Sequence, residues 1–275
     1  MKKFDGILIC TDLDGTLLRA DKTVSEENLS AIDRFRAEGG AFTFVTGRMP
    51  FYATDICRAV RSEVPFGCIN GGGIYDPREG KYLWKHEPLS RAVFDLLAYA
   101  EREMPDVGFQ LNTFDTLYTC RNTPALDNFR KITRMPYIPR AYREVEEPMA
   151  KVVFADFDPD RVTRLSELLA AHPLASEFDL MRSEQTLFEI LPKNTHKGVL
   201  IPKMAEVFGT AIEKTVAVGD YCNDITMLRA AGVGVAVQNA LPEVKEAADY
   251  ILPETNEQHA IAAIIRDIEG GRIRL

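Results

Sequence analysis

Cysteine is scarce in this sequence, and its spacing indicates neither a disulfide framework nor a zinc site. The 275 residues contain five cysteines, an odd number, and no two of them form a Cys-x-x-Cys pair. Unpaired cysteines are usually buried as small apolar side chains, so we expect reduced and mostly buried thiols. The five are Cys10, Cys57, Cys68, Cys120 and Cys222.

Long apolar runs and a surplus of positive charge are also missing. No run reaches the roughly 18 residues of a membrane span, and the short run from Ile7 to Cys10 is followed at once by acids, unlike a secretory signal. The net charge of −8 disfavours a protein that neutralises nucleic-acid phosphates. We therefore expect a cytoplasmic monomer or small homo-oligomer with no membrane or nucleic-acid partner, although a local cation would still allow a small anionic ligand.

The first part of the chain alternates strand and helix signals. Apolar, partly β-branched runs at residues 6–11, 41–46 and 66–70 are typical of buried strands. Between them, helices are predicted at residues 25–39, where Ser25 would cap, and at 51–62. Strand and helix in alternation indicate βαβ units, and therefore a parallel sheet in an α/β fold.

The pattern changes between residues 73 and 190. A hairpin at 73–85 is followed by strands in neighbouring pairs, which indicates an inserted α+β domain. Its helices are predicted at 90–104 and 160–172, and its strands at 107–112, 116–120, 151–157, 178–182 and 186–190. The alternation then resumes, with helices at 195–208, 225–231, 242–247 and 259–269 and strands at 214–219 and 234–237. We predict a core formed by residues 1–81 and 190–275 and a second domain formed by residues 82–189.

Polar residues follow the predicted core strands where these strands end. In an open α/β sheet the carboxyl ends of the strands carry the functional site. The segments concerned are Asp12–Thr16, Thr46–Arg48, Asn70–Gly72 and Gly219–Asp224. Four carboxylates, those of Asp12, Asp14, Asp220 and Asp224, would converge there, and like charges so close call for a cation. Oxygen ligands without histidine or cysteine favour Mg²⁺.

The same residue types suit phosphoryl transfer. A carboxylate can attack phosphorus and form an aspartyl-phosphate if a metal and nearby donors take up the charge. Asp12 and Asp14 suit a division of labour, in which one attacks and the other handles the proton of the leaving oxygen. Thr46 offers a hydroxyl and an N–H group. Lys197, predicted in the first turn of a helix, offers an ammonium group beside a positive helix end.

Five motifs, taken together, resemble those of the haloacid dehalogenase superfamily. They are DLDGTL, TGR, NGG, HKG and GDYCND, in this order, with a long insert between NGG and HKG. The stretch from Gly219 to Ile251 further resembles the Cof-type phosphatase branch. That resemblance implies a Rossmann-like parallel-sheet core and, in the position of the insert, an α+β cap of the C2 type that selects the substrate. It also implies a Mg²⁺-dependent phosphatase of small phosphorylated metabolites, with sugar phosphates as the leading substrate class.

The resemblance assigns roles to individual residues. Asp12 would be the nucleophile and a Mg²⁺ ligand, and Asp14 would give its carbonyl to the metal and serve as general acid and then base. Asp220 would be the third ligand, with Asp224 holding the metal shell directly or through water. The phosphate would be bound by Leu13, Thr46, Gly47, Lys197 and Asn223. Phosphatases and mutases of the superfamily carry an acid at the position of Asp14. A sugar phosphomutase is therefore the alternative enzyme, and a non-catalytic binding protein is the alternative if the protein is not an enzyme.

Several further residues allow two interpretations. Arg48 would either take part in the site or pair with a surface acid, and Asn70 with Gly71 would either face the substrate or form a plain turn. Asn239 follows a strand and could reach the site. The sequence departs from the family pattern at residues 194–196, before the lysine, and at residues 257–260, which puts in doubt any cap-closing role of the second segment.

Overall fold

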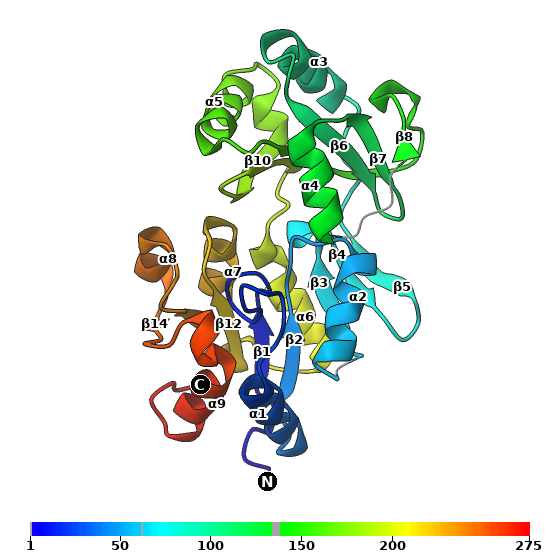
Figure 1. Ribbon diagram of the computed structural model, residues 1–275. Coiled ribbons are helices and arrows are strands. Elements are labelled where there is room, and N and C mark those ends of the chain that lie inside the picture. The colour runs from blue at the N-terminus through cyan, green and yellow to red at the C-terminus, as the bar shows by residue number, and fades with distance from the viewer. Residues whose placement is uncertain (1, 62, 134–137) are drawn as a thin grey trace. The chain divides into compact units, whose positions relative to one another are not determined.

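The first strand of the chain lies inside a parallel sheet, between strands from both ends of the sequence (Figure 1). The order is β14-β13-β12-β1-β2, and every neighbouring pair is parallel. The strands are β1 (Leu8–Thr11), β2 (Ala41–Phe44), β12 (Thr215–Gly219), β13 (Val233–Ala236) and β14 (Tyr250–Ile251). All four residues of β1 are buried, as expected for a strand covered on both faces. The predicted α/β class with a parallel core is therefore confirmed, although the short β14 was not predicted.

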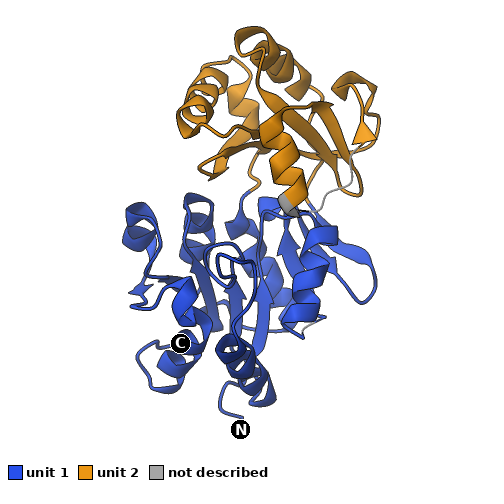
Figure 2. Cartoon of the chain, in the orientation of Figure 1, with its two compact units in different colours: residues 1–85, 196–275 blue, residues 86–195 orange. Residues whose placement is uncertain are grey.

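The computed structural model describes residues 2–61, 63–133 and 138–275, and it divides into two compact units (Figure 2). Unit 1 comprises Met1–Lys85 and His196–Leu275, and unit 2 comprises His86–Thr195. These limits lie a few residues beyond the predicted 82 and 189. The reason is strand pairing: β5 (Lys81–Lys85) pairs with β4 (Gly73–Asp76) in unit 1, and β11 (Leu187–Pro192) stays paired with β10 (Phe178–Glu184) in unit 2.

Six α-helices accompany the parallel sheet in the described part of unit 1. They are α1 (Glu26–Ala37), α2 (Pro50–Ala59), α6 (Leu200–Phe208), α7 (Ile225–Ala230), α8 (Pro242–Ala247) and α9 (Ala260–Glu269). Ser25 caps α1 by accepting a hydrogen bond from Asn28 N, and Asn28 Oδ1 in turn accepts one from Ala262 N at the start of α9. Residue 62, the last of the helix predicted at 51–62, lies outside the described residues. Helix α6 begins only at Leu200, after a 3₁₀ turn at Lys197–Val199, which places Pro202 in its first turn, where a missing N–H is tolerated.

The third predicted core strand joins the parallel sheet by a single bridge. β3 (Phe66–Cys68) pairs antiparallel with β4, and β4 pairs with β5 in the predicted hairpin. Only Gly67 forms a parallel bridge, with Val45 just after β2. The segment that follows β3 is thereby held beside the segment that follows β2.

Unit 2 is built on one six-stranded sheet, in the order β10-β11-β9-β6-β7-β8. The remaining strands are β6 (Gly108–Thr113), β7 (Leu117–Arg121), β8 (Ile138–Pro139) and β9 (Met149–Ala155). One apolar cluster joins α3 (Val93–Glu103) and α5 (Pro159–Ala170) to the sheet through residues such as Leu97, Leu165 and Phe154. A smaller cluster places Leu126 of α4 (Pro124–Thr133) against Val153 and Leu187. The predicted α+β character is confirmed, but α4 and β8 were not predicted.

The cysteines are mostly buried thiols, as the sequence predicts. No disulfide joins any of the five cysteines, all of which lie within the described residues; three are buried, Cys120 is half-buried and Cys222 is exposed. Within the described ranges, no helix combines the length and the apolar character that crossing a membrane requires.

Candidate active site

Asp12 continues the sheet directly beyond β1. Its backbone N–H donates to Val218 O of β12 at 2.8 Å, and Thr11 Oγ1 donates to its carbonyl at 2.8 Å. The chain then turns at Gly15, whose φ of +81° lies in the left-handed region. Leu13 is fully buried, and its carbonyl accepts the N–H groups of Leu17 and Leu18. The turn thus fixes both neighbouring acids at the carboxyl end of the strand.

Lys197 connects two of the predicted carboxylates. Its Nζ lies 2.6 Å from Asp12 Oδ1 and 2.6 Å from Asp224 Oδ1, and its side chain is fully buried. Burial alone would lower the pKa of this lysine, but the two carboxylates outweigh it and raise the pKa. For Asp12, burial outweighs the attraction of Lys197, and with repulsion from Asp224 and Asp220 it raises the pKa well above the ordinary value. One ammonium group therefore does not offset the negative charge gathered here.

The loop after β12 positions the other two acids. Asp224 Oδ2 accepts hydrogen bonds from the N–H groups of Asp220 at 2.9 Å and Tyr221 at 3.0 Å. Gly219 is required by this loop, because a Cβ there would lie 2.4 Å from the Cβ of Asp224. Thr16 Oγ1 donates to Asp220 Oδ1 at 2.6 Å. Burial, and then the charge of Asp224, raise the pKa of Asp220 to about 7.

Asp12, Asp220 and Asp224 form a cluster suited to a cation. One carboxylate oxygen from each lies within 4.8 Å of the others. Burial and mutual repulsion raise the pKa values of Asp12 and Asp220 by disfavouring their charged forms; a divalent cation would offset this cost, and an all-oxygen set fits Mg²⁺. Both oxygens of Asp224 already accept hydrogen bonds, from Lys197 and from backbone N–H groups. The donor set therefore fits the predicted metal, with Asp12 and Asp220 the better placed carboxylates and Asp224 orienting the others.

The side chain of Asp14 is paired with two cations. Arg48 donates two hydrogen bonds to it, from Nε to Oδ2 at 2.9 Å and from Nη2 to Oδ1 at 2.7 Å. Lys22 adds a third, from Nζ at 2.8 Å. Burial raises the pKa of Asp14, but Arg48 and then Lys22 lower it by more, and the net pKa is below the ordinary value. The partner of Arg48 is thus Asp14, which is itself a predicted site residue.

The segment after β2 lies beside the turn after β3. Thr46 is buried, and its hydroxyl oxygen accepts a hydrogen bond from Arg48 N at 3.2 Å. Gly47 leaves room for Asn70, because a Cβ at Gly47 would lie 2.8 Å from the amide nitrogen of that side chain. Asn70 Oδ1 accepts a hydrogen bond from Asn223 Nδ2 at 3.1 Å. Gly71 faces the His196 carbonyl, which would lie 2.3 Å from a Cβ.

Asn239 and the C-terminal segment hold the loop that follows Asp14. Asn239 Nδ2 donates to Gly15 O at 2.7 Å, and its Oδ1 accepts from Asn256 N at 3.0 Å. Asn256 Nδ2 donates to Leu18 O at 2.9 Å, and Glu257 Oε1 accepts from Ala20 N at 2.7 Å. The segment that departs from the family pattern thus contacts the loop between Gly15 and Ala20.

Three contributors to the site were missed by sequence reasoning. Lys22, Thr16 and Asn256 contact the predicted residues or their loop, but each stands in a loop with no periodic pattern. The family motif DLDGT contains Thr16, so its position was visible, but nothing in the sequence pointed to Asp220 as its partner.

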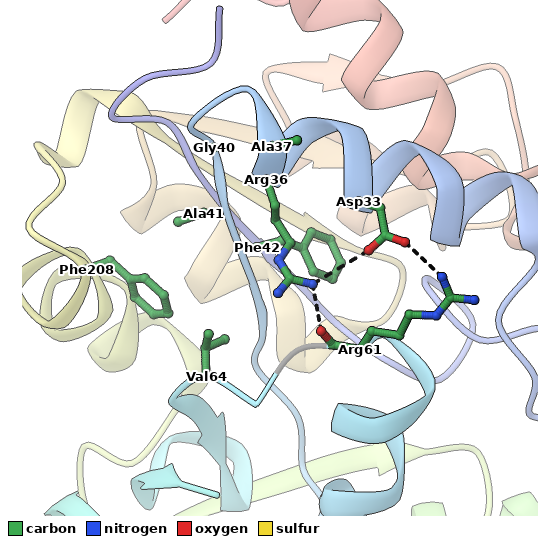
Figure 3. A pocket seen from close by; sticks show the side chains of 9 residues that line it. All are labelled: Asp33, Arg36, Ala37, Gly40, Ala41, Phe42, Arg61, Val64 and Phe208. Atoms are coloured by element: carbon green, nitrogen blue, oxygen red, sulfur yellow. Dashed lines mark hydrogen bonds and ion pairs between the residues drawn. The ribbon is translucent and has the colours of Figure 1, made fainter. Parts of the chain in front are cut away.

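A separate pocket of about 560 Å³ lies elsewhere on unit 1 (Figure 3). Phe42, Val64 and Phe208 line its apolar side, and Asp33, Arg36 and Arg61 its polar side. The guanidinium of Arg36 donates to Arg61 O at 2.8 Å, and Arg61 Nη1 donates to Asp33 Oδ2 at 3.1 Å. These arginines are engaged with partners of their own, and none of the predicted site residues lines this pocket.

Comparison with known proteins agrees with this geometry. A family model described as haloacid dehalogenase-like hydrolase matches residues 9–265. Phosphatase YwpJ of Bacillus subtilis (strain 168) is 29% identical, over 95% of this chain and 99% of its own. From the same strain, 5-amino-6-(5-phospho-D-ribitylamino)uracil phosphatase YwtE is 26% identical, over 96% and 98%. A solved haloacid dehalogenase-like hydrolase from B. subtilis superposes with a TM-score of 0.81 at 27% identity, covering 98% of this chain and 100% of that one.

Proposed function

Because the chain belongs to the haloacid dehalogenase-like hydrolases, we propose that it is a Mg²⁺-dependent phosphomonoesterase acting on small phosphorylated metabolites. One observation carries this proposal: Lys197 lies 2.6 Å from both Asp12 and Asp224, in a cluster that includes Asp220. A largely buried group of three acids with one lysine costs folding energy, so it fits a site that binds a divalent cation, and the cation together with the lysine would stabilise the negative charge of a phosphoryl group. The relatives named above are phosphatases.

Asp12 is the nucleophile in this proposal. Its carboxylate attacks phosphorus, the ester oxygen leaves, and an aspartyl-phosphate forms on Asp12. Lys197 first holds Asp12 in place and then donates to the transferred phosphoryl group. Asp12, Asp220 and the carbonyl of Asp14 would hold Mg²⁺, Asp224 would hold the metal shell directly or through water, and the ion would supply positive charge to the phosphoryl oxygens.

Asp14 moves the proton. It protonates the leaving oxygen in the first half of the reaction and takes a proton from the hydrolytic water in the second. In this structure Arg48 and Lys22 hold the side chain of Asp14 through three hydrogen bonds, which favours its ionised form. Asp14 therefore has to take up a proton from solvent before it acts as the acid, and Arg48 and Lys22 hold its side chain in the orientation in which it works.

The phosphate is bound by donors from four loops. Thr46 and Gly47 follow β2, Asn223 follows β12, and Lys197 opens the turn before α6. Backbone and side-chain N–H groups with one ammonium suit a tetrahedral anion. The backbone of Leu13, within the turn after β1, completes this set.

Unit 2 acts as the cap that selects the leaving group. It is inserted between the two parts of unit 1, as the family resemblance implies. Sugar phosphates are the proposed substrate class, and one relative is named for a phosphate ester on a ribityl chain, which is also a polyol.

Hydrolysis of para-nitrophenyl phosphate tests the proposal. We expect turnover with Mg²⁺, none with EDTA, and a loss of at least about 10³-fold for Asp12→Asn. Asp5→Asn, an exposed acid before β1, is the matched control and retains activity. Turnover independent of metal, or full activity in Asp12→Asn, would contradict the proposal. With a sugar monophosphate, free phosphate indicates the hydrolase and an isomeric sugar phosphate indicates the mutase.

A further inference from the structure

The turn after β3 has an unusual backbone. Ile69 has φ +57° and Asn70 has φ +51°, and both residues are fully buried. The left-handed region is unfavourable for residues with a Cβ, asparagine tolerates it best, and a β-branched residue there is an outlier. Such strain persists only where the surrounding structure holds it, and it gathers at functional sites.

Backbone hydrogen bonds hold this turn against the segment after β2. Ile69 N donates to Arg48 O at 3.1 Å, and Asn70 N donates to Thr46 O at 3.0 Å. Thr46 N in turn donates to Gly67 O at 3.0 Å. The strained turn is therefore hydrogen-bonded to the segment Thr46–Arg48, which contributes Thr46 and Gly47 to the proposed phosphate site.

The side chain of Asn70 lies beside Gly47 of that segment and contacts Asn223 of the loop after β12. Its amide occupies the space beside Gly47, where a Cβ would lie 2.8 Å from Nδ2 and 2.9 Å from Oδ1. Its Oδ1 accepts a hydrogen bond from Asn223 Nδ2 at 3.1 Å. A single buried side chain thus meets residues of two loops that are far apart in the sequence.

We propose that Asn70 is a positioning residue that fixes Gly47 and Asn223 in the orientation that binds phosphate. The proposal rests on the proposed function of this site. An amide carries two N–H groups, so the bond from Asn223 to Asn70 directs one of them and thereby fixes the direction of the other. Asparagine suits this position for two reasons: it tolerates the left-handed backbone, and its short side chain places an acceptor oxygen within hydrogen-bond distance of Asn223.

Two substitutions separate positioning from a purely structural role. Asn70→Gly and Asn70→Ala remove the same amide, but glycine adopts the left-handed backbone freely and alanine does not. We expect the alanine variant to melt about 2–4 °C below the glycine variant. We expect both to lose kcat/KM equally, by about tenfold, the equivalent of one hydrogen bond, and mainly through KM. Activity that follows the melting temperature, or wild-type kcat/KM in Asn70→Gly, would overturn the proposal.

A double-mutant cycle tests the contact with Asn223. If Asn70 acts through Asn223, the variant Asn70→Gly/Asn223→Ala loses little more kcat/KM than Asn223→Ala alone. Losses that multiply would overturn the proposal. Asn70→Asp retains the acceptor oxygen, so we expect it to keep the orientation of Asn223. In NMR spectra the side-chain amide resonance of Asn223 should then be unchanged in Asn70→Asp and shifted in Asn70→Gly.

Binding of orthophosphate separates this proposal from the function on which it rests. Calorimetry with Mg²⁺ measures the affinity for orthophosphate without turnover, and we expect it to fall about tenfold in Asn70→Gly. If the wild type binds orthophosphate but hydrolyses no ester, the proposed function fails. Weaker orthophosphate binding by Asn70→Gly would still support the positioning role. If esters are hydrolysed and all variants bind orthophosphate equally, the positioning proposal alone is overturned.

Discussion

Arg48 donates two parallel hydrogen bonds to the carboxylate of Asp14, from Nε to Oδ2 at 2.9 Å and from Nη2 to Oδ1 at 2.7 Å. Only a guanidinium presents such a planar fork to a carboxylate. Because the two residues follow neighbouring parallel strands, β1 and β2, the fork joins two loops at the same edge of the sheet. Asp14 is therefore held in one orientation by a residue 34 positions away in the sequence.

Replacing the fork by a single ammonium group is expected to lower activity. Arg48→Lys keeps the positive charge but cannot make both hydrogen bonds, so we expect kcat/KM to fall about tenfold or more with little change in the melting temperature. Arg58→Lys is the matched control, because Arg58 is an exposed residue of α2 paired with Asp55. Steady-state kinetics on para-nitrophenyl phosphate measure kcat/KM for both variants. Equal values for the two would count against a role of the paired hydrogen bonds between Arg48 and Asp14.

Removal of the buried lysine is expected to destabilise the fold. Lys197→Met leaves the carboxylates of Asp12 and Asp224 without their shared cation, and breaking a buried pair in this way typically costs about 3–5 kcal/mol of the free energy of unfolding. Urea unfolding in EDTA measures the difference. Lys193→Met removes a mostly exposed lysine paired with Asp179 and is expected to cost no more than about 1 kcal/mol. Equal losses for the two variants would mean that the buried charges are already balanced in another way.

Mg²⁺ is expected to stabilise the folded protein through the same acids. The negative charge of the carboxylates of Asp12, Asp220 and Asp224 exceeds the positive charge of the one ammonium group beside them. The ion therefore binds the native state in preference to the unfolded chain. At a concentration 100 times its Kd it would add about 2.7 kcal/mol, seen as a rise in melting temperature that EDTA abolishes. The rise should be lost in Asp220→Asn and kept in Asp5→Asn. A rise of the same size in both variants would place the ion elsewhere.

The convergence of these acids could be predicted because parallel strands share an edge. Asp12 follows β1 and Asp220 follows β12, and these strands are direct neighbours. Lys197, which belongs to a turn and not to a strand, was predicted there from its place in the first turn of a helix and from the family resemblance. The structure brings all three together with Asp224, and the chemical roles assigned to them stay predictions.

Contacts between loops could not be predicted. Lys22 reaches Asp14 from a turn that the sequence marks only as polar, and Asn256 binds the carbonyl of Leu18, a group that every residue carries. Hydrogen bonds to backbone leave no pattern in side-chain types. Helix α4 was missed although its sequence is amphipathic: Leu126 lies in a core cluster, and Ala125 and Phe129 of the same helix pack against it.

Stability at acid pH is expected to depend on Asp267 of α9. This carboxylate is 1% exposed, and Tyr250 Oη donates to its Oδ2 at 2.8 Å. Burial raises its pKa, but hydrogen bonds from Arg272 and Tyr250 lower it by more, so the pKa is lower in the folded state than in the unfolded chain. Its contribution is therefore present above the unfolded pKa of about 3.9 and disappears as the pH falls through the folded value.

Asp267→Asn should show this dependence directly. We expect a lower free energy of unfolding than wild type at pH 7 and a difference that shrinks steadily below about pH 4. Asp115→Asn, an exposed acid in unit 2, should follow the wild-type curve. Urea unfolding across the pH range measures all three proteins. A constant gap between Asp267→Asn and wild type would assign the loss to packing and not to charge.

Gly15 and Gly209 separate the cost of a left-handed backbone from the cost of a clash. Both have positive φ, +81° and +64°, but a Cβ at Gly15 would lie 2.4 Å from Asp220 Oδ2, whereas one at Gly209 meets nothing within 4 Å. Gly209→Ala is expected to lose about 1–2 kcal/mol of stability and to keep wild-type kcat/KM. Gly15→Ala bears the same backbone cost and also displaces the Asp220 carboxylate, so we expect it to lose activity by at least about 10²-fold together with the Mg²⁺-dependent rise in melting temperature. If Gly15→Ala keeps both, the position of Asp220 is not what the reaction requires.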